Sequence, residues 1–432
     1  MQLQTATLNN MLTRITARYA GSLISLLIFL GGGAALLAQE NELCFECHND
    51  PEALGSTGDS LYVDSERYTT SIHGRMEMEC TGCHQDLADF EDWPHPERLE
   101  KVDCGMCHDD RVDDWESSVH GLPAQDKNDL DAASCADCHG SHYILPGDEP
   151  ASMIYPSNLP YTCLSCHGDS KLEGKHEGMG RADKVVNYFR SVHGQALEKS
   201  GLIISATCSS CHGSHSIRPL TEFDLDIPRI CGNCHAPIYN DYLQGVHGAA
   251  YLEANPDVPI CTDCHGEHNI LGPDDPKSEV SPKQLSAVCS RCHEDKSLSR
   301  KYGLPLGRLD SYLNSYHGVA IELGDLRVAN CASCHDFHDI RPSSDPRSSI
   351  HPDNLAKTCG ECHPNAGGNF ALGKIHIQDE REDNLGAWLV KKAYLVFIFG
   401  LVGGFIAFIT VDLFAHRRRK IARLEESGEE DK

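Results

Sequence analysis

Every cysteine of the chain belongs to a Cys-x-x-Cys pair that is followed at once by a histidine. The 22 cysteines of the 432 residues form eleven such motifs, with none left over. The paired cysteines are Cys44 and Cys47, Cys80 and Cys83, Cys104 and Cys107, Cys135 and Cys138, Cys163 and Cys166, Cys208 and Cys211, Cys231 and Cys234, Cys261 and Cys264, Cys289 and Cys292, Cys331 and Cys334, and Cys359 and Cys362. The histidines that complete the motifs are His48, His84, His108, His139, His167, His212, His235, His265, His293, His335 and His363.

This pattern is typical of the covalent attachment of haem c. Two thiols at this spacing add to the two vinyl groups on one edge of a porphyrin, and the adjacent histidine places its imidazole beneath the iron. Zinc ribbons, thioredoxin-like redox pairs and disulfide frameworks also use closely spaced cysteines, but none of them needs a histidine after each pair. The sequence therefore predicts eleven covalently attached haem c groups, each with a proximal histidine ligand.

Fourteen further histidines lie outside the motifs, and most follow regular spacings. After the odd-numbered motifs, the next histidine of the series stands 24–26 or 12–13 residues past the proximal one, usually in a Ser/Gly-x-His-Gly setting. After motifs four, six, eight and ten, a histidine stands three residues past the proximal one; motif two has one eleven residues on. We expect eleven distal iron ligands: His73, His95, His120, His142, His193, His215, His247, His268, His317, His338 and His376.

Three histidines, His176, His351 and His416, fall outside this series. Within it, His142 stands only three residues after His139. Residues i and i+3 of a helix share a face, so His142 is expected on the same side of its haem as His139 and must ligate a neighbouring haem instead. Two histidine ligands favour a lower reduction potential than a histidine and a methionine.

The motifs also recur with a period of four. Motifs one, five and nine begin at Cys44, Cys163 and Cys289, which are 119 and 126 residues apart. We expect two four-haem repeats, 39–160 and 161–286, and a third, three-haem repeat at 287–387. Each motif has only about 32 residues of chain around it, too few for a conventional core. The expected fold is therefore mainly α with extensive irregular loops and almost no sheet, a quasi-linear array with haems packed between its elements.

Two apolar segments flank this haem region. Residues 1–38 carry Arg14 and Arg18 ahead of an uncharged apolar run, which is typical of an export signal, either cleaved or kept as an anchor. Residues 393–411 form an apolar stretch of the length that spans a bilayer as a helix, whereas a buried core helix would not need the charges that flank it. We expect a transmembrane helix in residues 388–416. The basic cluster that follows, Arg417, Arg418, Arg419, Lys420 and Arg423, predicts a cytoplasmic tail at 417–432.

With these motifs, the chain resembles the membrane-anchored multihaem c-type cytochromes of the cytochrome c3 and doubled-CxxCH class. The resemblance covers nearly all of residues 44–376 and rests on the Cys-x-x-Cys-His motifs, on Cys-His-Gly-x-His as at Cys138 to His142, and on the Ser-Val-His-Gly stretches. It implies bis-histidine haems in close stacked or T-shaped contact, relaying electrons between a membrane quinol-oxidising partner and periplasmic acceptors. The chain departs from quinol dehydrogenases with four haems behind one N-terminal anchor, because it has eleven motifs and a C-terminal apolar segment.

These features favour an electron-transfer protein of a respiratory chain. We expect an undecahaem c-type cytochrome on the periplasmic side of a bacterial inner membrane, relaying electrons from a membrane b-type cytochrome or quinol-oxidising subunit to periplasmic acceptors. The apolar segment 393–411 contains no histidine to bind a haem b, so a partner must supply the quinone site. The formal net charge of -27 argues against binding to nucleic acid and favours a basic partner such as a small c-type cytochrome.

The alternative function is an enzyme, a multihaem reductase of nitrite, hydroxylamine or a sulfur oxyanion with one open haem. Such chemistry needs an iron with a free coordination position. All eleven motifs end in histidine, and an open iron would arise if His95 or His376 is not a ligand. We therefore expect an electron-carrying subunit of an oxidoreductase complex rather than an enzyme in its own right.

Overall fold

The computed structural model describes residues 41–125, 129, 131–176, 182–218, 225–371, 373, 375–377 and 385–429. The expected export signal in residues 1–38 and the last three residues of the expected cytoplasmic tail lie outside this range.

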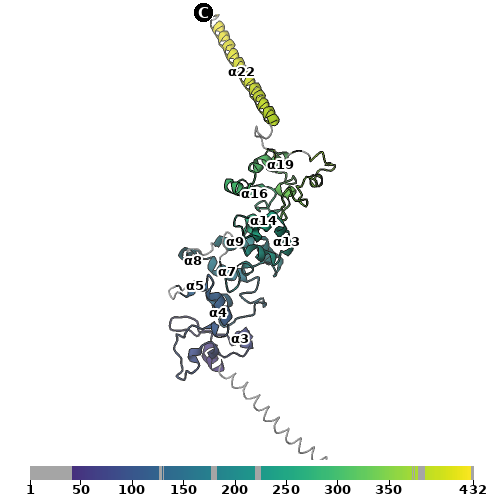
Figure 1. Ribbon diagram of the computed structural model, residues 1–432. Coiled ribbons are helices and arrows are strands. Elements are labelled where there is room, and N and C mark those ends of the chain that lie inside the picture. Colours follow the sequence, from purple (N-terminus) through teal and green to yellow (C-terminus); the bar gives the residue numbers. More distant parts are fainter. Residues whose placement is uncertain are drawn as a thin grey trace, which may run out of the picture. The chain divides into compact units, whose positions relative to one another are not determined.

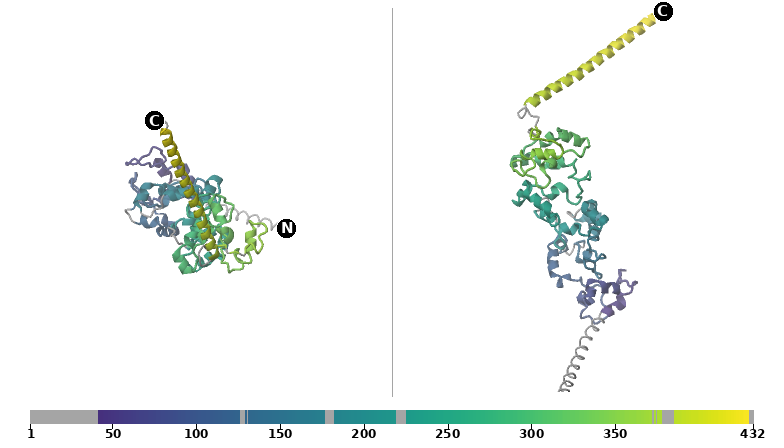
Figure 2. Two further views of the ribbon diagram at one scale, coloured as in Figure 1. Left: turned by 90° about the horizontal axis from the view of Figure 1, so that it is seen from above. Right: turned by 90° about the vertical axis from the view of Figure 1, so that its right-hand side faces the viewer.

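Short helices joined by irregular segments make up the described part of the haem region (Figure 1). Two further views of the chain show the same alternation of short coils and long connecting loops (Figure 2). Among the described residues, the β-type pairing is a single isolated bridge between Leu54 and Ser60. The expectation of a mainly α fold with extensive loops and almost no sheet is confirmed.

The chain divides into two compact units. Unit 1 comprises Met1–Cys234 and Gly266–Leu271, and unit 2 comprises His235–His265 and Gly272–Lys432. The repeat boundaries expected at residues 160 and 286 follow from the spacing of the motifs. The division into two units does not test them, so they stay a prediction.

Unit 1 contains eleven named α-helices and three 3-10 helices among its described residues. Its elements are α2 (Ser65–Thr70), α3 (Ile72–Arg75), η1 (Cys80–Gly82), η2 (Gln85–Leu87), η3 (Cys104–Met106), α4 (Asp109–Glu116), α5 (Gly121–Ala124), α6 (Cys135–His139), α7 (Leu159–His167), α8 (Ser170–Lys175), α9 (Ala182–Arg190), α10 (Val192–Ser200), α11 (Cys208–His212) and α12 (Ile227–Gly232). Residues 41–48, which carry the first motif, are also helical.

Unit 2 continues the same pattern and ends in one long helix. Its elements are α13 (Ala236–Gln244), α14 (Val246–Leu252), α15 (Cys261–His265), α16 (Leu285–His293), α17 (Lys296–Tyr302), α18 (Arg308–Leu313), α19 (Tyr316–Glu322), α20 (Cys331–His335), α21 (Leu355–Gly360) and α22 (Leu385–Glu429).

Few apolar side chains are buried in either unit. Leu87, Leu197 and Ile227 are the buried apolar side chains of unit 1 among the described residues, and unit 2 buries Tyr251, Ile260, Ile321 and Ala332. These side chains lie on or beside the helices that carry the motifs and the expected distal histidines. The protein part of the core is therefore small, as the short chain length per motif predicts.

Helix α22, the long yellow helix of Figure 1, contains the C-terminal apolar segment. Residues Trp388–Ile421 of it are long and apolar enough to cross a membrane, with a mean hydropathy of 2.4 in the most apolar stretch. The helix continues without a break into the basic cluster that begins at Arg417.

Candidate functional site

The even-numbered motifs from the fourth to the tenth each form a five-residue helix that ends at the proximal histidine. These are α6, α11, α15 and α20. A polar side chain in the first turn closes the start of each helix; in α6, the backbone N–H of Ser134 donates to Asp137 Oδ2 at 2.7 Å. The residue after the histidine then adopts a left-handed backbone, with φ of 81° at Gly140 and 84° at Gly213. This turn requires glycine or a residue that tolerates positive φ, such as Asp336 in the tenth motif.

The turn at Gly140 corrects one step of the sequence analysis. Helix α6 ends at His139, so His142 is not on the same helix and the expected shared helix face is wrong. The reversal of the backbone carries His142 away from its own motif. Its ring lies opposite His84, the proximal histidine of the second motif, with the ring centres 6.2 Å apart.

Ten of the expected distal histidines lie opposite a proximal histidine in this way. The ring centres of each pair are 5.8–6.3 Å apart. In six pairs the distal histidine follows an even-numbered motif or, for His376, the last motif. We call these the even series: His95 with His48, His142 with His84, His215 with His139, His268 with His212, His338 with His265, and His376 with His335. Four form the odd series: His73 with His108, His120 with His167, His247 with His293, and His317 with His363.

The two series run in opposite directions along the chain. An odd-series histidine faces the proximal histidine two motifs ahead of the motif it follows, as His73 does with His108. Four of the even-series histidines, His142, His215, His268 and His338, face the proximal histidine two motifs back. At the two ends of the array the step is one motif: His95, after motif two, faces motif one, and His376, after motif eleven, faces motif ten. The eleventh expected ligand, His193, is in unit 1, and the eleventh proximal residue, His235, is the first residue of unit 2.

The separation between the paired rings fits an iron ligated on both sides. With metal–nitrogen bonds of about 2.0 Å and about 1.1 Å from an imidazole nitrogen to its ring centre, two imidazoles across one metal have centres about 6 Å apart. Several rings are also oriented through their other nitrogen. His48 Nδ1 lies 2.7 Å from the carbonyl oxygen of Leu61, and His95 Nδ1 lies 2.8 Å from that of Pro96. These contacts leave Nε2 free to bind a metal.

Burial favours the neutral form of several paired imidazoles, such as His120, His247 and His265, by lowering their pKa, and the neutral form is the one that binds iron. Burial and, to a smaller extent, the facing His293 lower the pKa of His247 to about 4. The pKa of His120 is lowered by burial and then by His167, and that of His265 by burial and then by His338. A neutral ring offers an unprotonated nitrogen to a metal without first losing a proton.

The odd-series histidines share a helix start. Except before His247, where Gly245 takes this position, a serine ends the preceding segment and accepts a hydrogen bond from the start of the next helix; Ser191 Oγ accepts from the N–H of Gly194 at 3.1 Å, and Ser315 Oγ accepts from that of Gly318 at 3.2 Å. The glycine after the histidine packs on the helix before it. A Cβ at Gly248 would lie 2.1 Å from the carbonyl oxygen of Tyr242. The Ser-x-His-Gly pattern therefore describes a capped, sharply bent pair of helices.

Sequence reasoning missed an aromatic residue that stands five positions before each odd-series histidine: Tyr68, Trp115, Tyr188, Tyr242 and Tyr312. Each donates a hydrogen bond to the carbonyl two residues before the next even-numbered motif. The acceptors, in the same order, are Met78 (2.6 Å), Ala133 (3.2 Å), Ala206 (2.9 Å), Pro259 (3.0 Å) and Ala329 (3.2 Å). The repeated spacing of tyrosine or tryptophan was the signal that could have revealed these residues.

The phenols of this set remain protonated donors at neutral pH. Burial raises the pKa of Tyr68 to about 12, and the nearby Cys80 and Cys83 contribute to the rise. Burial likewise raises the pKa of Tyr312 to about 12.

Cysteines of successive motifs lie next to one another. In the thiol form, a hydrogen bond with Cys44 and then burial raise the pKa of Cys80. The same contact joins Cys163 with Cys208 in unit 1 and Cys289 with Cys331 in unit 2. Burial and then the nearby Cys359 and Cys362 raise the pKa of Cys334. The proximity of these cysteines shows that motifs ten and eleven are neighbours. Within each unit, the order of the motifs along the chain is thus also their order in space.

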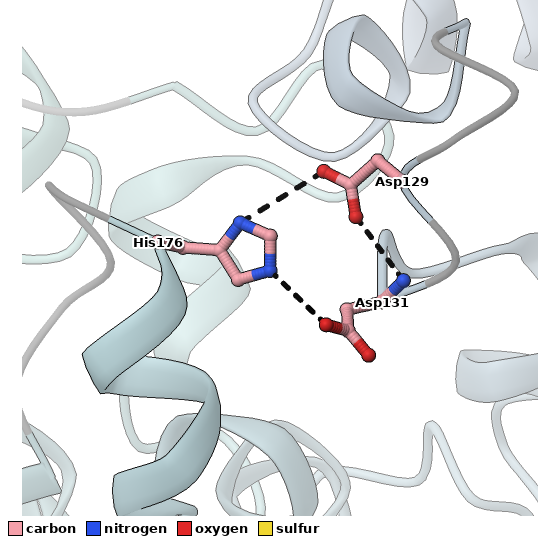
Figure 3. Close-up of side chains that lie close together, drawn as sticks. All are labelled: Asp129, Asp131 and His176. Atoms are coloured by element: carbon pink, nitrogen blue, oxygen red, sulfur yellow. Dashed lines mark hydrogen bonds and ion pairs between the residues drawn. The ribbon is translucent and has the colours of Figure 1, made fainter.

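Two of the three histidines outside the expected ligand series, His176 and His351, have other partners. His176 lies between two carboxylates, with Nδ1 3.8 Å from Asp129 Oδ2 and Nε2 3.5 Å from Asp131 Oδ2 (Figure 3). The ammonium of Lys175 lies 2.7 Å from the same oxygen of Asp131, and its hydrogen bond lowers the pKa of that carboxyl. The three side chains of Figure 3 are close enough to share a cation, but Lys175 already supplies a positive charge to this ion-paired cluster. His351 contacts Asp353, whose N–H lies 3.3 Å from its Nδ1.

Comparisons with known proteins find likenesses to cytochromes. Residues 72–168 match the family model for cytochrome c3. A stretch of 249 residues is 23% identical to the multiheme cytochrome MtrA of Shewanella baltica (strain OS185) and covers 55% of this chain and 65% of that protein. The chain thus spans slightly less than two thirds of this relative. No solved structure matches the chain. Together with the Cys-x-x-Cys-His motifs, these likenesses support a multihaem c-type cytochrome.

Proposed function

We propose that this chain is an undecahaem electron relay in which every iron is held between two histidines. The observation that carries the proposal is the set of ten facing histidine pairs, each with its ring centres 5.8–6.3 Å apart. Every proximal histidine outside the motif-seven site has a matched partner. An electron relay needs saturated irons, since a free coordination position would allow substrates to bind.

The residues divide the work of holding each haem. The two cysteines of a motif anchor the porphyrin edge, the motif histidine binds one side of the iron, and the distal histidine binds the other. A haem held in this way supplies an iron that accepts and releases one electron.

The order of the motifs supports a relay along the chain. Thiol contacts between successive motifs, such as Cys44 with Cys80 and Cys289 with Cys331, place neighbouring attachment sites side by side within each unit. Electrons that enter at one end of a unit would then pass the motifs in chain order. Because the distal ligands come from other motifs, the protein also holds neighbouring sites at constant separation.

The chain would be anchored in a bacterial inner membrane by α22, with the haem region in the periplasm. The length and apolar character of Trp388–Ile421 support the anchor, and the basic residues from Arg417 to Lys420 support a cytoplasmic C-terminus. The apolar segment 393–411 has no histidine, so electrons would enter from a membrane b-type cytochrome or quinol-oxidising subunit. The acceptors would be small periplasmic or other c-type cytochromes.

The haem count tests this proposal. The full-length chain, purified in detergent after export in a host that assembles c-type cytochromes, would be analysed by haem absorbance against protein concentration from amino-acid analysis. Eleven haems per chain are expected, with no turnover of nitrite, hydroxylamine or sulfite by the reduced protein. Fewer haems would contradict the undecahaem relay, and steady turnover of one of these substrates would favour the reductase.

A further inference from the structure

The facing histidine pairs differ in the angle between their rings, and the difference follows the two series. In the six even-series pairs the planes are 8–32° apart, so the rings are close to parallel. In the four described odd-series pairs the planes are 45–66° apart. The ranges do not overlap, although the separation of the ring centres is the same in both series.

The local structure accounts for this division in eight of the ten pairs, that is, in all except the pairs of His95 and His376. Even-series histidines such as His142 and His215 follow the left-handed residue that ends a motif helix, as at Gly140 and Gly213. Odd-series histidines stand in the first turn of a capped helix that is bent sharply against the helix before it. A side chain in the first turn of such a helix takes its direction from the helix axis. The plane of the odd-series ring therefore depends on what orients the helix pair.

The aromatic residues five positions earlier orient that pair. Tyr242, near the end of α13, donates through its hydroxyl to the carbonyl oxygen of Pro259 at 3.0 Å, just before the eighth motif. A second tie holds the histidine-bearing helix itself: the N–H of Val246 donates to the carbonyl oxygen of Ile340 at 2.8 Å, two residues after His338. The equivalent ties in unit 1 run from Ile72 to Ile144, from Val119 to Ile217 and from Val192 to Ile270.

Both ties join an even-numbered site to the next odd-numbered one. Tyr242 connects the attachment segment of motif eight to the helix pair that carries His247, the histidine facing motif nine. Val246 and Ile340 connect the distal ligand segments of the same two sites. The chemistry of the donor varies, since Trp115 replaces tyrosine in one repeat and still donates to Ala133. What recurs is an aromatic side chain with a hydrogen-bond donor.

We propose that Tyr68, Trp115, Tyr188, Tyr242 and Tyr312 are positioning residues that hold the odd-series imidazoles at a large angle to their proximal partners, so that two electronically distinct classes of haem site result. This inference rests on the proposed bis-histidine ligation. Two of the iron d orbitals interact with the π systems of the axial imidazoles. Parallel imidazole planes both raise the energy of the same one of these orbitals and so separate the two in energy, whereas crossed planes raise the energy of both and leave them closer together. Crossed planes therefore give ferric low-spin haem a larger highest g value, and the two classes can be distinguished by their spectra.

Low-temperature EPR of the full-length, air-oxidised holoprotein tests the inference. The wild-type protein is expected to show two groups of low-spin signals, with the larger highest g value assigned to the odd-series sites. Tyr242→Phe keeps the ring but removes the donor, and is expected to shift part of the large-g signal while the haem content stays at the wild-type value. Trp115→Phe is expected to do the same, and Trp115→Tyr, which keeps a donor, is expected to restore the wild-type spectrum.

Tyr302→Phe is the matched control. The Tyr302 hydroxyl donates to Asn255 Oδ1 at 2.9 Å and to Asp257 Oδ2 at 2.7 Å, but Tyr302 belongs to none of the repeated ties. Its variant is expected to keep the wild-type spectrum. If Tyr242→Phe and Trp115→Phe lose only thermal stability and keep both signal groups unchanged, the aromatic residues are structural and the inference is wrong. A wild-type protein with one low-spin class would also overturn it and leave the proposed function standing, whereas a wild-type protein without bis-histidine haems would overturn both.

Discussion

His142 lies opposite His84, although it follows the fourth motif and His84 completes the second. Their ring centres are 6.2 Å apart. The same two-motif step recurs at His215 with His139, and it reverses direction in the odd series, where His73 faces His108. A site of this protein is therefore completed by chain that lies one or two motifs away. In each of the ten sites with a facing pair, the second histidine follows a different motif from the first.

The first prediction concerns the site that His142 serves. His142→Ala removes an imidazole that faces His84, so the second haem is expected to become high-spin and to bind CO after reduction, while the fourth haem stays low-spin. Optical spectra of the reduced protein with and without CO measure the change. One CO-binding haem per chain is the expected amount.

A second variant identifies which haem responds. In a Cys80→Ser/Cys83→Ser background, which lacks the second attachment site, adding His142→Ala is expected to cause no additional CO binding. Extra CO binding in that background would place His142 on another haem and contradict the pairing with His84.

The second prediction concerns the bent helix pair that carries His247. Gly248→Ala places a Cβ 2.1 Å from the carbonyl oxygen of Tyr242, so α14 must move away from α13. Forced overpacking of this kind costs about 1–3 kcal/mol of unfolding free energy, and it displaces His247. Thermal unfolding and the low-spin fraction of the holoprotein are both expected to fall.

Gly174→Ala in α8 is the control for that change. A Cβ at Gly174 meets no heavy atom within 4 Å, so this variant is expected to keep wild-type stability or to gain slightly from the lower entropy of its unfolded chain. Equal losses in the two variants would mean that the close approach at Gly248 does not constrain the fold.

The third prediction is a pH dependence of unit 2. A hydrogen bond from Arg347, helped by one from the buried Arg341, lowers the pKa of Asp345. A carboxyl whose pKa is lower in the folded state stabilises the fold above its unfolded pKa of about 4, and this contribution disappears as the pH falls through the folded pKa. Asp345→Asn is therefore expected to lower the melting temperature at pH 7 more than at pH 3.

The exposed Asp353 provides the comparison for Asp345. Asp353→Asn is expected to leave the melting temperature nearly unchanged at both pH values. If Asp345→Asn lowers stability equally at pH 7 and pH 3, the ion pairs with Arg347 and Arg341 do not carry the effect.

The fourth prediction follows from the acidic charge of the chain. With a formal net charge of -27, the reduced protein is expected to pass electrons rapidly to a basic small c-type cytochrome at low salt. Because salt screens such attraction over about 10 Å at 0.1 M, the second-order rate measured by stopped flow is expected to fall steeply as the salt concentration rises. An acidic cytochrome is the control, and equal, salt-independent rates with both cytochromes would contradict charge-steered docking.

The attachment motifs could be predicted from the sequence because their chemistry requires contiguous residues. Cys44, Cys47 and His48 must lie within a few residues of one another to hold one porphyrin, so their spacing in the sequence reveals the attachment site. The mainly helical, loop-rich fold could be predicted as well, because so little chain separates the motifs. The expected membrane helix lies within α22, whose length and apolar character are those of a spanning segment.

The pairing of the histidines could not be predicted in the same way. The partner of His142 depends on a left-handed turn at Gly140 and on the path of the chain back to motif two. The aromatic residues were missed for a related reason: Tyr242 acts on the carbonyl of Pro259, 17 residues away, and only the fold brings the two together. Long-range geometry of this kind becomes visible in a sequence only as a repeated spacing.

The ligation of the irons is the central claim, and the near-infrared magnetic circular dichroism spectrum of the air-oxidised, full-length protein tests it most directly. The position of the charge-transfer band in this spectrum distinguishes bis-histidine haems from histidine–methionine and high-spin haems, and its intensity gives their number. We predict that the whole intensity, calibrated against the haem count, belongs to bis-histidine haems. A band from a high-spin or methionine-ligated haem that accounts for one haem or more would contradict this account.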